Sequence, residues 1–300
     1  MTSWIKANRP LLLRTAGTLL AIVLLGVLLY QGGWDDIQNA LQRVSLQNLT
    51  LAASCVILSR FFVTLRWHIL LRSGGVKIAF KDTLSLVFTG LFANNFLPTT
   101  IGGDVVRLAG AIQMGYDQAI CLASIAADRV VNMIGMSLAA PLGLWQLLQT
   151  GAILQSISLA SLWQKGWGFL LRTVESFSIW LKKPSALLLS LVCALLHMFF
   201  SFSANYILIK SLGESLPLWK VIGLFSLAYF VSLVPVSING YGVQELTVTF
   251  LLSRFGGVSL AVSATVAVLH RLLMMLVSLP GALTLPGVMA KMDRSQREKT

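Results

Sequence analysis

The sequence predicts an all-α fold, a polytopic helical membrane protein, and two features of its composition carry that prediction. Of its 300 residues, 56% are hydrophobic and only 11% are charged, whereas soluble domains carry roughly 25% charged residues. The apolar residues also gather into runs close to the roughly 20 residues that a membrane-spanning helix requires. We therefore expect a single membrane domain over residues 1–300, with about six full spans and two shorter re-entrant hairpins.

Each expected span is an apolar run bounded by charged or turn-forming residues. The first, 12–30, follows a basic N-terminus and is not followed by a small-residue cleavage site, so we expect an uncleaved span. Another, 150–170, is weaker because Lys165 interrupts it. The remaining expected spans are 49–71, 118–148, 186–209 and 258–285.

Two further apolar runs, 82–97 and 219–234, are too short to cross a bilayer comfortably. Each runs into a Pro/Gly-rich stretch, Pro98–Asp104 in one case and Pro235–Gly242 in the other, and both stretches fit Pro-x-(Thr/Ser)-Ile-x-Gly. Such interruptions, occurring in corresponding positions of two halves, are typical of the broken helices of transporters.

A second shared pattern follows each stretch, with the order polar-Arg-apolar-apolar-x-Met. The first copy is Asp128–Met133 and the second is His270–Met275. Two shared patterns in the same order predict an internal duplication, with halves at about 49–149 and 186–285.

The distribution of basic residues predicts the topology, because Lys and Arg concentrate in cytoplasmic loops. With the N-terminus in the cytoplasm and 150–170 crossing the bilayer, the basic clusters at 66–81, 172–183 and 291–299 all fall on the cytoplasmic side, together with the C-terminus. The first hairpin then opens from the cytoplasm and the second from outside, so the repeats are inverted. If 150–170 does not cross, the second half flips and Lys182 and Lys183 lie outside, which is less favourable.

Polar residues inside the apolar runs are the candidate site. Arg60 lies near the middle of an expected span, too deep to reach water easily, so it must face the interior, a partner or an anionic ligand. Arg66 and Arg72 lie nearer the cytoplasmic end, where extension of the side chain to the interface is the simpler interpretation. Asp104 and Arg107 are spaced to pair on one helix face, and Glu245 is expected to pair with Arg271 or Arg254.

The glycines of the two stretches have two interpretations. They can let backbone N–H groups at a broken helix approach an anion, or they can simply kink a packed span. Because the stretches form a matched pair, we favour a binding site. The residues expected to contact a substrate are Arg60, Asn94, Asn95, Thr99, Gly102, Gly103, Asp104, Arg107, Asp128, Arg129, Ser237, Asn239, Gly240, Gly242, Glu245 and Arg271.

Several other chemistries lack the motifs that would support them. The sequence contains no GxSxG, HExxH or P-loop pattern and no cysteine–histidine metal spacing, so we expect no enzyme activity, cofactor or metal. The net charge of +12 fits cytoplasmic loops facing anionic lipid, and no nucleic-acid-binding motif accompanies it.

Three motifs taken together, Asn94–Arg107, Asp128-Arg129 and Pro235–Glu245, resemble the lysylphosphatidylglycerol synthase transmembrane-region family, also called flippase-like proteins. The resemblance covers almost the whole chain. It implies a membrane domain that moves an aminoacylated phosphatidylglycerol across the bilayer, while a separate soluble domain, which this sequence lacks, makes that lipid. His270 departs from the apolar or aromatic residue common in relatives, which puts any coupling role at that position in doubt.

The expected function is therefore a flippase or transporter for a lipid with an anionic, phosphate-containing head group in a bacterial cytoplasmic membrane. Two alternatives remain open. One is a membrane-embedded transferase acting on a lipid-linked substrate through Asp104, Asp128 or Glu245, and the other is an accessory subunit of a glycosyltransferase. A functional link to a lipid-modifying enzyme and homo-oligomerisation are also left open by the sequence.

Overall fold

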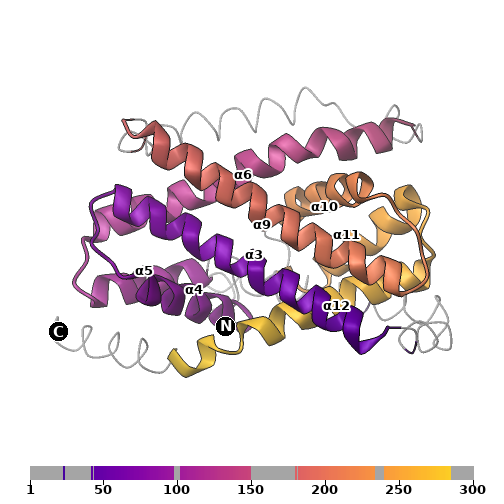
Figure 1. The fold of residues 1–300 in the computed structure, drawn as a ribbon, viewed down its shortest axis with the longest axis horizontal. Coiled ribbons are helices and arrows are strands. Elements are labelled where there is room, and N and C mark those ends of the chain that lie inside the picture. The colour runs from indigo at the N-terminus through magenta and orange to yellow at the C-terminus, as the bar shows by residue number, and fades with distance from the viewer. Residues whose placement is uncertain are drawn as a thin grey trace, which may run out of the picture.

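The computed structural model describes residues 44–97, 102–149, 182–233 and 240–284, together with positions 23, 42 and 180. The regular structure of these residues is helical (Figure 1). The expected spans 12–30 and 150–170 lie outside the described residues, so the total of six spans stays a prediction.

Four helices are long and apolar enough to cross a membrane. They coincide with the four expected spans that fall on described residues, because continuous apolar sequence without helix breakers favours long helices. Ser45 accepts the N–H of Asn48 at 3.2 Å at the start of the first helix, and Pro184 occupies the first turn of the third. The helices are α3 (Leu46–Ser73), α6 (Gln118–Gln149), α9 (Pro184–Ser211) and α12 (Leu260–Ser278).

The shorter helices come in two packed pairs, α4 with α5 and α10 with α11. A helix of 15 residues, the length of α4 and of α10, is only about 22 Å long at 1.5 Å per residue, less than the roughly 30 Å of a hydrocarbon core. Each helix is therefore too short to cross a bilayer by itself, which is what a re-entrant hairpin requires. The path of such a hairpin stays a prediction. The bounds are α4 (Phe80–Asn94), α5 (Gly102–Gln113), α10 (Leu218–Ser232) and α11 (Val243–Leu251), the last continuing into a π-helical turn, η3 (Leu252–Gly256).

Helices α3 and α9 run antiparallel, side by side, through the centre of the molecule and pack against each other (Figure 1). The contact between the midpoints of the two helices is called the α3–α9 crossing below. Helices α6 and α12 each contact both of them. The α4–α5 pair lies to one side of the crossing and the α10–α11 pair to the other. The crossing therefore joins the two predicted halves of the chain.

The residues at the crossing occupy equivalent positions in the two helices. Ser59 lies 13 residues after the first residue of α3 and His197 lies 13 residues after the first residue of α9, and their side chains are hydrogen-bonded at 2.7 Å. Phe62 and Phe200, three residues further along each helix, stack with ring centroids 5.6 Å apart. Contacts between equivalent residues arise where two copies are related by a two-fold axis. The duplication itself stays a prediction.

Glycine allows two helix pairs to approach closely. A Cβ at Gly143 of α6 would lie 2.3 Å from the carbonyl oxygen of Gly223 in α10, and a Cβ at Gly103 of α5 would lie 2.4 Å from that of Gly90 in α4. Both distances are shorter than any van der Waals contact, so these helices can pack at the observed separation only without side chains there.

The α6–α10 contact gives a test of this packing. Gly143→Ala should lower the free energy of unfolding by about 1–3 kcal/mol, because the added methyl group must push the α10 backbone away. Gly135→Ala is the matched control on the same helix, since its Cβ would meet the flexible end of Met198 at 3.1 Å. Thermal unfolding in detergent measures both variants, and equal melting temperatures would contradict the close contact.

Candidate functional site

A cavity of about 380 Å³ lies between the helices. All eight described α-helices contribute to its wall, and the charged groups come from α3, α5, α6 and α12. Charged side chains in the interior of a membrane protein mark a functional site by default. The polar residues that line the cavity are Arg60, Arg66, Asn94, Asn95, Asp104, Arg107, Asp128, Arg129, Asn132, His197, Ser201, Tyr229, Ser232, Gln244, His270, Arg271 and Ser278.

Five of these residues form a continuous network of ion pairs. Asp128 of α6 accepts Nε of Arg66 at 2.6 Å and lies 3.5 Å from Nη2 of Arg107. Arg107 continues to Asp104 at 3.1 Å, and Asp104 accepts Nε of Arg129 at 2.5 Å. The predicted pairing of Asp104 with Arg107 is thus confirmed. Alternation of charge lets both carboxylates and three guanidinium groups lie in the bundle without uncompensated neighbours.

Arg66 corrects the expectation that its side chain extends to the membrane interface. It is 4% exposed, and it also donates to Oδ1 of Asn132 at 2.7 Å. The reason is electrostatic, because buried Asp128 requires a fully hydrogen-bonded cation and Arg66 is the side chain of α3 that meets it. Distance along the helix was therefore a poor guide to where this side chain points.

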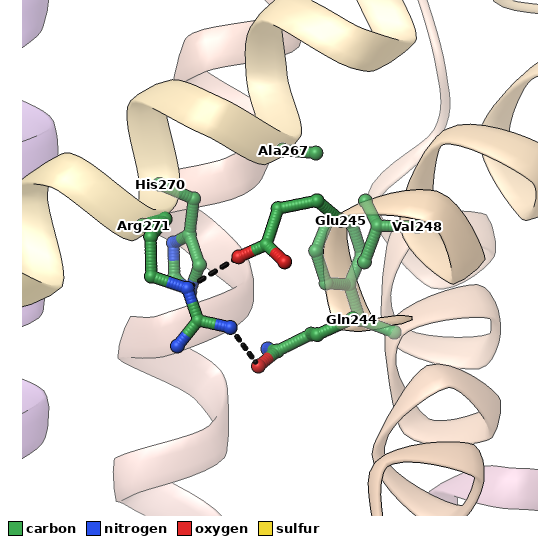
Figure 2. Close-up of a pocket in the computed structure, with 7 residues that line it drawn as sticks. Gln244, Glu245, Val248, Ala267, His270 and Arg271 are labelled. Carbon is green, nitrogen blue, oxygen red and sulfur yellow. Dashed lines mark hydrogen bonds and ion pairs between the residues drawn. The ribbon is translucent and has the colours of Figure 1, made fainter. Parts of the chain in front are cut away.

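A second cluster surrounds Arg271 of α12. Figure 2 shows its side chain reaching toward α11, where it pairs with Glu245 and donates to Oε1 of Gln244 at 2.8 Å. Its guanidinium also lies over the Tyr241 ring, 4.9 Å from the centroid. Of the two partners predicted for Glu245, Arg271 is the one observed, and Arg254 is exposed.

Tyr241, just before the start of α11, contacts the end of α4. Its hydroxyl donates to the carbonyl oxygen of Asn95, the residue that ends α4, at 3.1 Å. The side chain of Asn95 in turn donates to Ser278 of α12 at 2.9 Å. The ends of the two motifs, distant in sequence, therefore meet at the cavity.

Arg60 differs from the other guanidinium groups in the cavity. It is 8% exposed, it donates to the sulfur of Met274, and it forms no ion pair with any residue that the structure describes. A thioether is a weak acceptor, so most of the five N–H donors of Arg60 remain available to a ligand. Nearby, His270 is buried and its Nδ1 has no hydrogen-bond partner among the described residues.

The backbone amides of the predicted glycines make their hydrogen bonds within the protein. Gly103 N–H donates to Oδ1 of Asn94 at 2.6 Å, and Gly242 N–H donates to Oε2 of Glu245 at 2.8 Å. Gly240 and Gly242 have φ of 73° and 77°, a conformation that glycine adopts without strain. The amides of Gly103 and Gly242 are thus occupied, and what the cavity offers to an anion is its guanidinium groups, which come from α3, α5, α6 and α12.

Most of the sequence-predicted residues meet at this one site. Those lining the cavity are Arg60, Asn94, Asn95, Asp104, Arg107, Asp128, Arg129, Gly240 and Arg271. Gly103, Gly242 and Glu245 are hydrogen-bonded to residues around it, and Gly102 is buried with its Cα facing Leu97. Thr99, Ser237 and Asn239 lie outside the described residues.

Sequence reasoning missed several residues of the cavity wall, among them Arg66, Asn132, His197 and Gln244. Asn132 had a usable signal, because it follows Asp128 by four residues and shares its helix face. His197 had none, since nothing in the sequence of α9 shows that this face crosses α3.

An all-helical bundle of apolar spans that encloses a charged cavity defines a membrane protein with an interior polar site. The sequence profile of the lysylphosphatidylglycerol synthase TM region matches residues 14–174 and 152–281. The chain belongs to this family, as its motifs predicted.

One curated relative is a UPF0104 membrane protein of Methanothermobacter thermautotrophicus. It is 30% identical over 138 residues, which make up 45% of this chain and 38% of the relative. In this match the chain spans well under half the length of the relative. The match therefore shows that the two sequences are similar and says nothing of the activity of the whole relative.

Asp128→Asn tests the ion-pair network. Removing the carboxylate charge leaves Arg66 and Arg107 facing each other in the interior, and we expect a loss of about 3–5 kcal/mol in stability. Asp117→Asn, at the residue just before the same helix, is the control, because Asp117 is exposed and an asparagine can still accept the N–H of Ile120. Thermal unfolding of both variants in detergent makes the comparison, and an equally stable Asp128→Asn protein would show that the network contributes little.

Proposed function

We propose that this protein is a lipid transporter that moves a lipid with an anionic, phosphate-containing head group between the leaflets of a bacterial cytoplasmic membrane. The head group would lie in the 380 Å³ cavity, while the acyl chains stay in the hydrocarbon. Both termini would face the cytoplasm.

The observation that carries the proposal is the buried guanidinium of Arg60, which has no carboxylate partner among the described residues. Burying an unpaired cation in a membrane interior is expensive. Such a group is best explained as half of an ion pair whose other half is a ligand. Arg is suited to phosphate, because its planar donors match two phosphate oxygens at once.

The rest of the wall supports an amphiphilic ligand. Val63, Leu91, Phe202 and Met274 line the cavity together with the charged groups. A purely ionic ligand would gain nothing from these apolar surfaces, whereas a lipid presents a polar head joined to hydrocarbon. The family membership of the chain supports the same class of substrate.

The contact of equivalent residues at the α3–α9 crossing supports a mechanism of alternating access. The two short-helix pairs would rock in turn about this crossing, so that the cavity faces first one leaflet and then the other. The hydrogen bond between Tyr241 and Asn95 would have to break in each cycle, because it joins the two moving parts.

Group transfer by a carboxylate pair is the competing function. Asp104 and Asp128 do approach each other, since both contact Arg107. However, a guanidinium lies between them and each carboxylate is engaged by two arginines, whereas general acid–base catalysis needs a carboxyl group that can reach the proton of a substrate. We therefore favour transport without chemistry.

The test is translocation of a fluorescent anionic phospholipid in proteoliposomes, followed by quenching from outside. Arg60→Ala should reduce the rate by at least about tenfold, since one charge-assisted hydrogen bond to phosphate is lost. Arg129→Ala, which removes a second cation of the cavity wall, should act in the same direction. Arg72→Ala on α3 is the matched control, because Arg72 is exposed. Unchanged translocation by Arg60→Ala protein that elutes as a folded species would overturn the site.

A further inference from the structure

The charges around the cavity do not balance. Five guanidinium groups line it, from Arg60, Arg66, Arg107, Arg129 and Arg271. The acidic groups that line it or pair with these arginines are Asp104, Asp128 and Glu245. Two positive charges are therefore in excess among the described residues.

The sequence between the two helices of each short pair does not change this balance. Residues 98–101 are Pro-Thr-Thr-Ile and residues 234–239 are Val-Pro-Val-Ser-Ile-Asn, so neither segment contains an acidic or basic side chain. His197 and His270 also line the wall and add no negative charge in either protonation state.

Each carboxylate is already engaged by the protein, so none is available to absorb the excess. Asp128 and Asp104 each bind two arginines, and Glu245 binds Arg271 and the N–H of Gly242. In a medium of low dielectric constant, uncompensated like charges repel strongly. A bound ligand with two negative charges would neutralise the site, whereas a ligand with one would leave it positive.

We propose that the head group is a phosphomonoester, a lipid with a terminal phosphate, in preference to a phosphodiester. This inference rests on the proposed function and narrows its substrate class. A phosphomonoester carries a charge of about −1.5 to −2 at pH 7 and presents three acceptor oxygens. A phosphodiester carries one charge and has only two terminal oxygens to share among the arginines.

Two guanidinium groups are placed to receive the additional charge. Arg60 has no ion-pair partner among the described residues. Arg129 is engaged within the protein, by Asp104 among others, but its side chain stays 40% exposed and adds positive charge to the same wall. A terminal phosphate that binds Arg60 through two oxygens has a third oxygen to turn toward this second charge only if it is a monoester.

Equilibrium binding to the purified full chain in detergent tests the proposal. The probes are phosphatidic acid and phosphatidylglycerol with identical acyl chains and the same fluorophore on one chain. We expect phosphatidic acid to bind at least about tenfold more tightly at pH 7.5. Equal affinities, or tighter binding of phosphatidylglycerol, would overturn the phosphomonoester assignment while leaving lipid transport in place.

Charge variants at one position separate charge balance from packing. Arg60→Gln reduces the excess to one, so the preference for phosphatidic acid should fall to within about threefold, whereas Arg60→Lys keeps the charge and should keep most of the preference. Arg72→Gln is the control at an exposed position of the same helix. A preference that is the same in Arg60→Gln and wild type would contradict the role of net charge.

Competition with inorganic phosphate and glycerol 3-phosphate distinguishes a lipid from a soluble ligand. Unlabelled phosphatidic acid sets the reference concentration for displacing the labelled lipid. We expect neither soluble phosphate to displace it even at ~100 times that concentration, because neither can contact the apolar wall. Displacement at equal concentration would identify a soluble phosphate as the ligand and overturn the lipid assignment. Failure of both labelled lipids to bind, or to cross proteoliposomes, would instead refute the proposed function itself.

Discussion

The buried carboxylate of Asp128 is the constraint on which much of the structure depends. Placed in a long apolar helix, it must be satisfied from neighbouring helices, and Arg66 of α3 and Arg107 of α5 supply that partnership. Arg107 in turn lies 4.0 Å from the Trp67 ring centroid and reaches Asp104. One charge thereby fixes how α3, α5 and α6 pack. A network of this kind favours one arrangement strongly, because each partner that moves away leaves another charge unpaired.

The two predicted halves of the chain differ in charge. By the alignment of the two Pro/Gly-rich motifs, Asp104 corresponds to Tyr241, and by the second motif Asp128 corresponds to His270. The ion pair of Asp104 with Arg129 in the first half is matched by the stacking of Tyr241 on Arg271 in the second. Both carboxylates of the first half are thus replaced by groups without a negative charge. Glu245 restores one of them and balances Arg271. The excess of positive charge therefore comes from the first half, whose four arginines at the cavity have only Asp104 and Asp128 as carboxylate partners.

The two Pro/Gly-rich motifs predicted that backbone amides bind the anion, whereas the fold offers side-chain cations. Glycines before a helix predicted free amides for an anion, yet Asn94 and Glu245 occupy the amides of Gly103 and Gly242. Satisfying these N–H groups internally stabilises the starts of α5 and α11 when no ligand is bound, since an unsatisfied peptide group in a membrane interior is costly. Side-chain cations remain for recognition, and they can reorient between two states of a transporter more easily than a helix terminus can.

The sequence by itself determined the class of protein, the four described spans, the two short-helix pairs, the family and most of the charged residues of the cavity wall. These follow from hydropathy, from helix-breaking residues and from the cost of charge in lipid, all of which are local properties. Only the tertiary structure decided that Arg66 faces Asp128, that Ser59 meets His197 where α3 crosses α9, and that Arg60 lacks a carboxylate. Those outcomes depend on the rotation and crossing of whole helices. Helix α3 has no distinct apolar face, and its buried side includes Arg60 and Arg66, so its hydropathy pattern does not mark which face packs inward. That choice is made by partners far away in the chain.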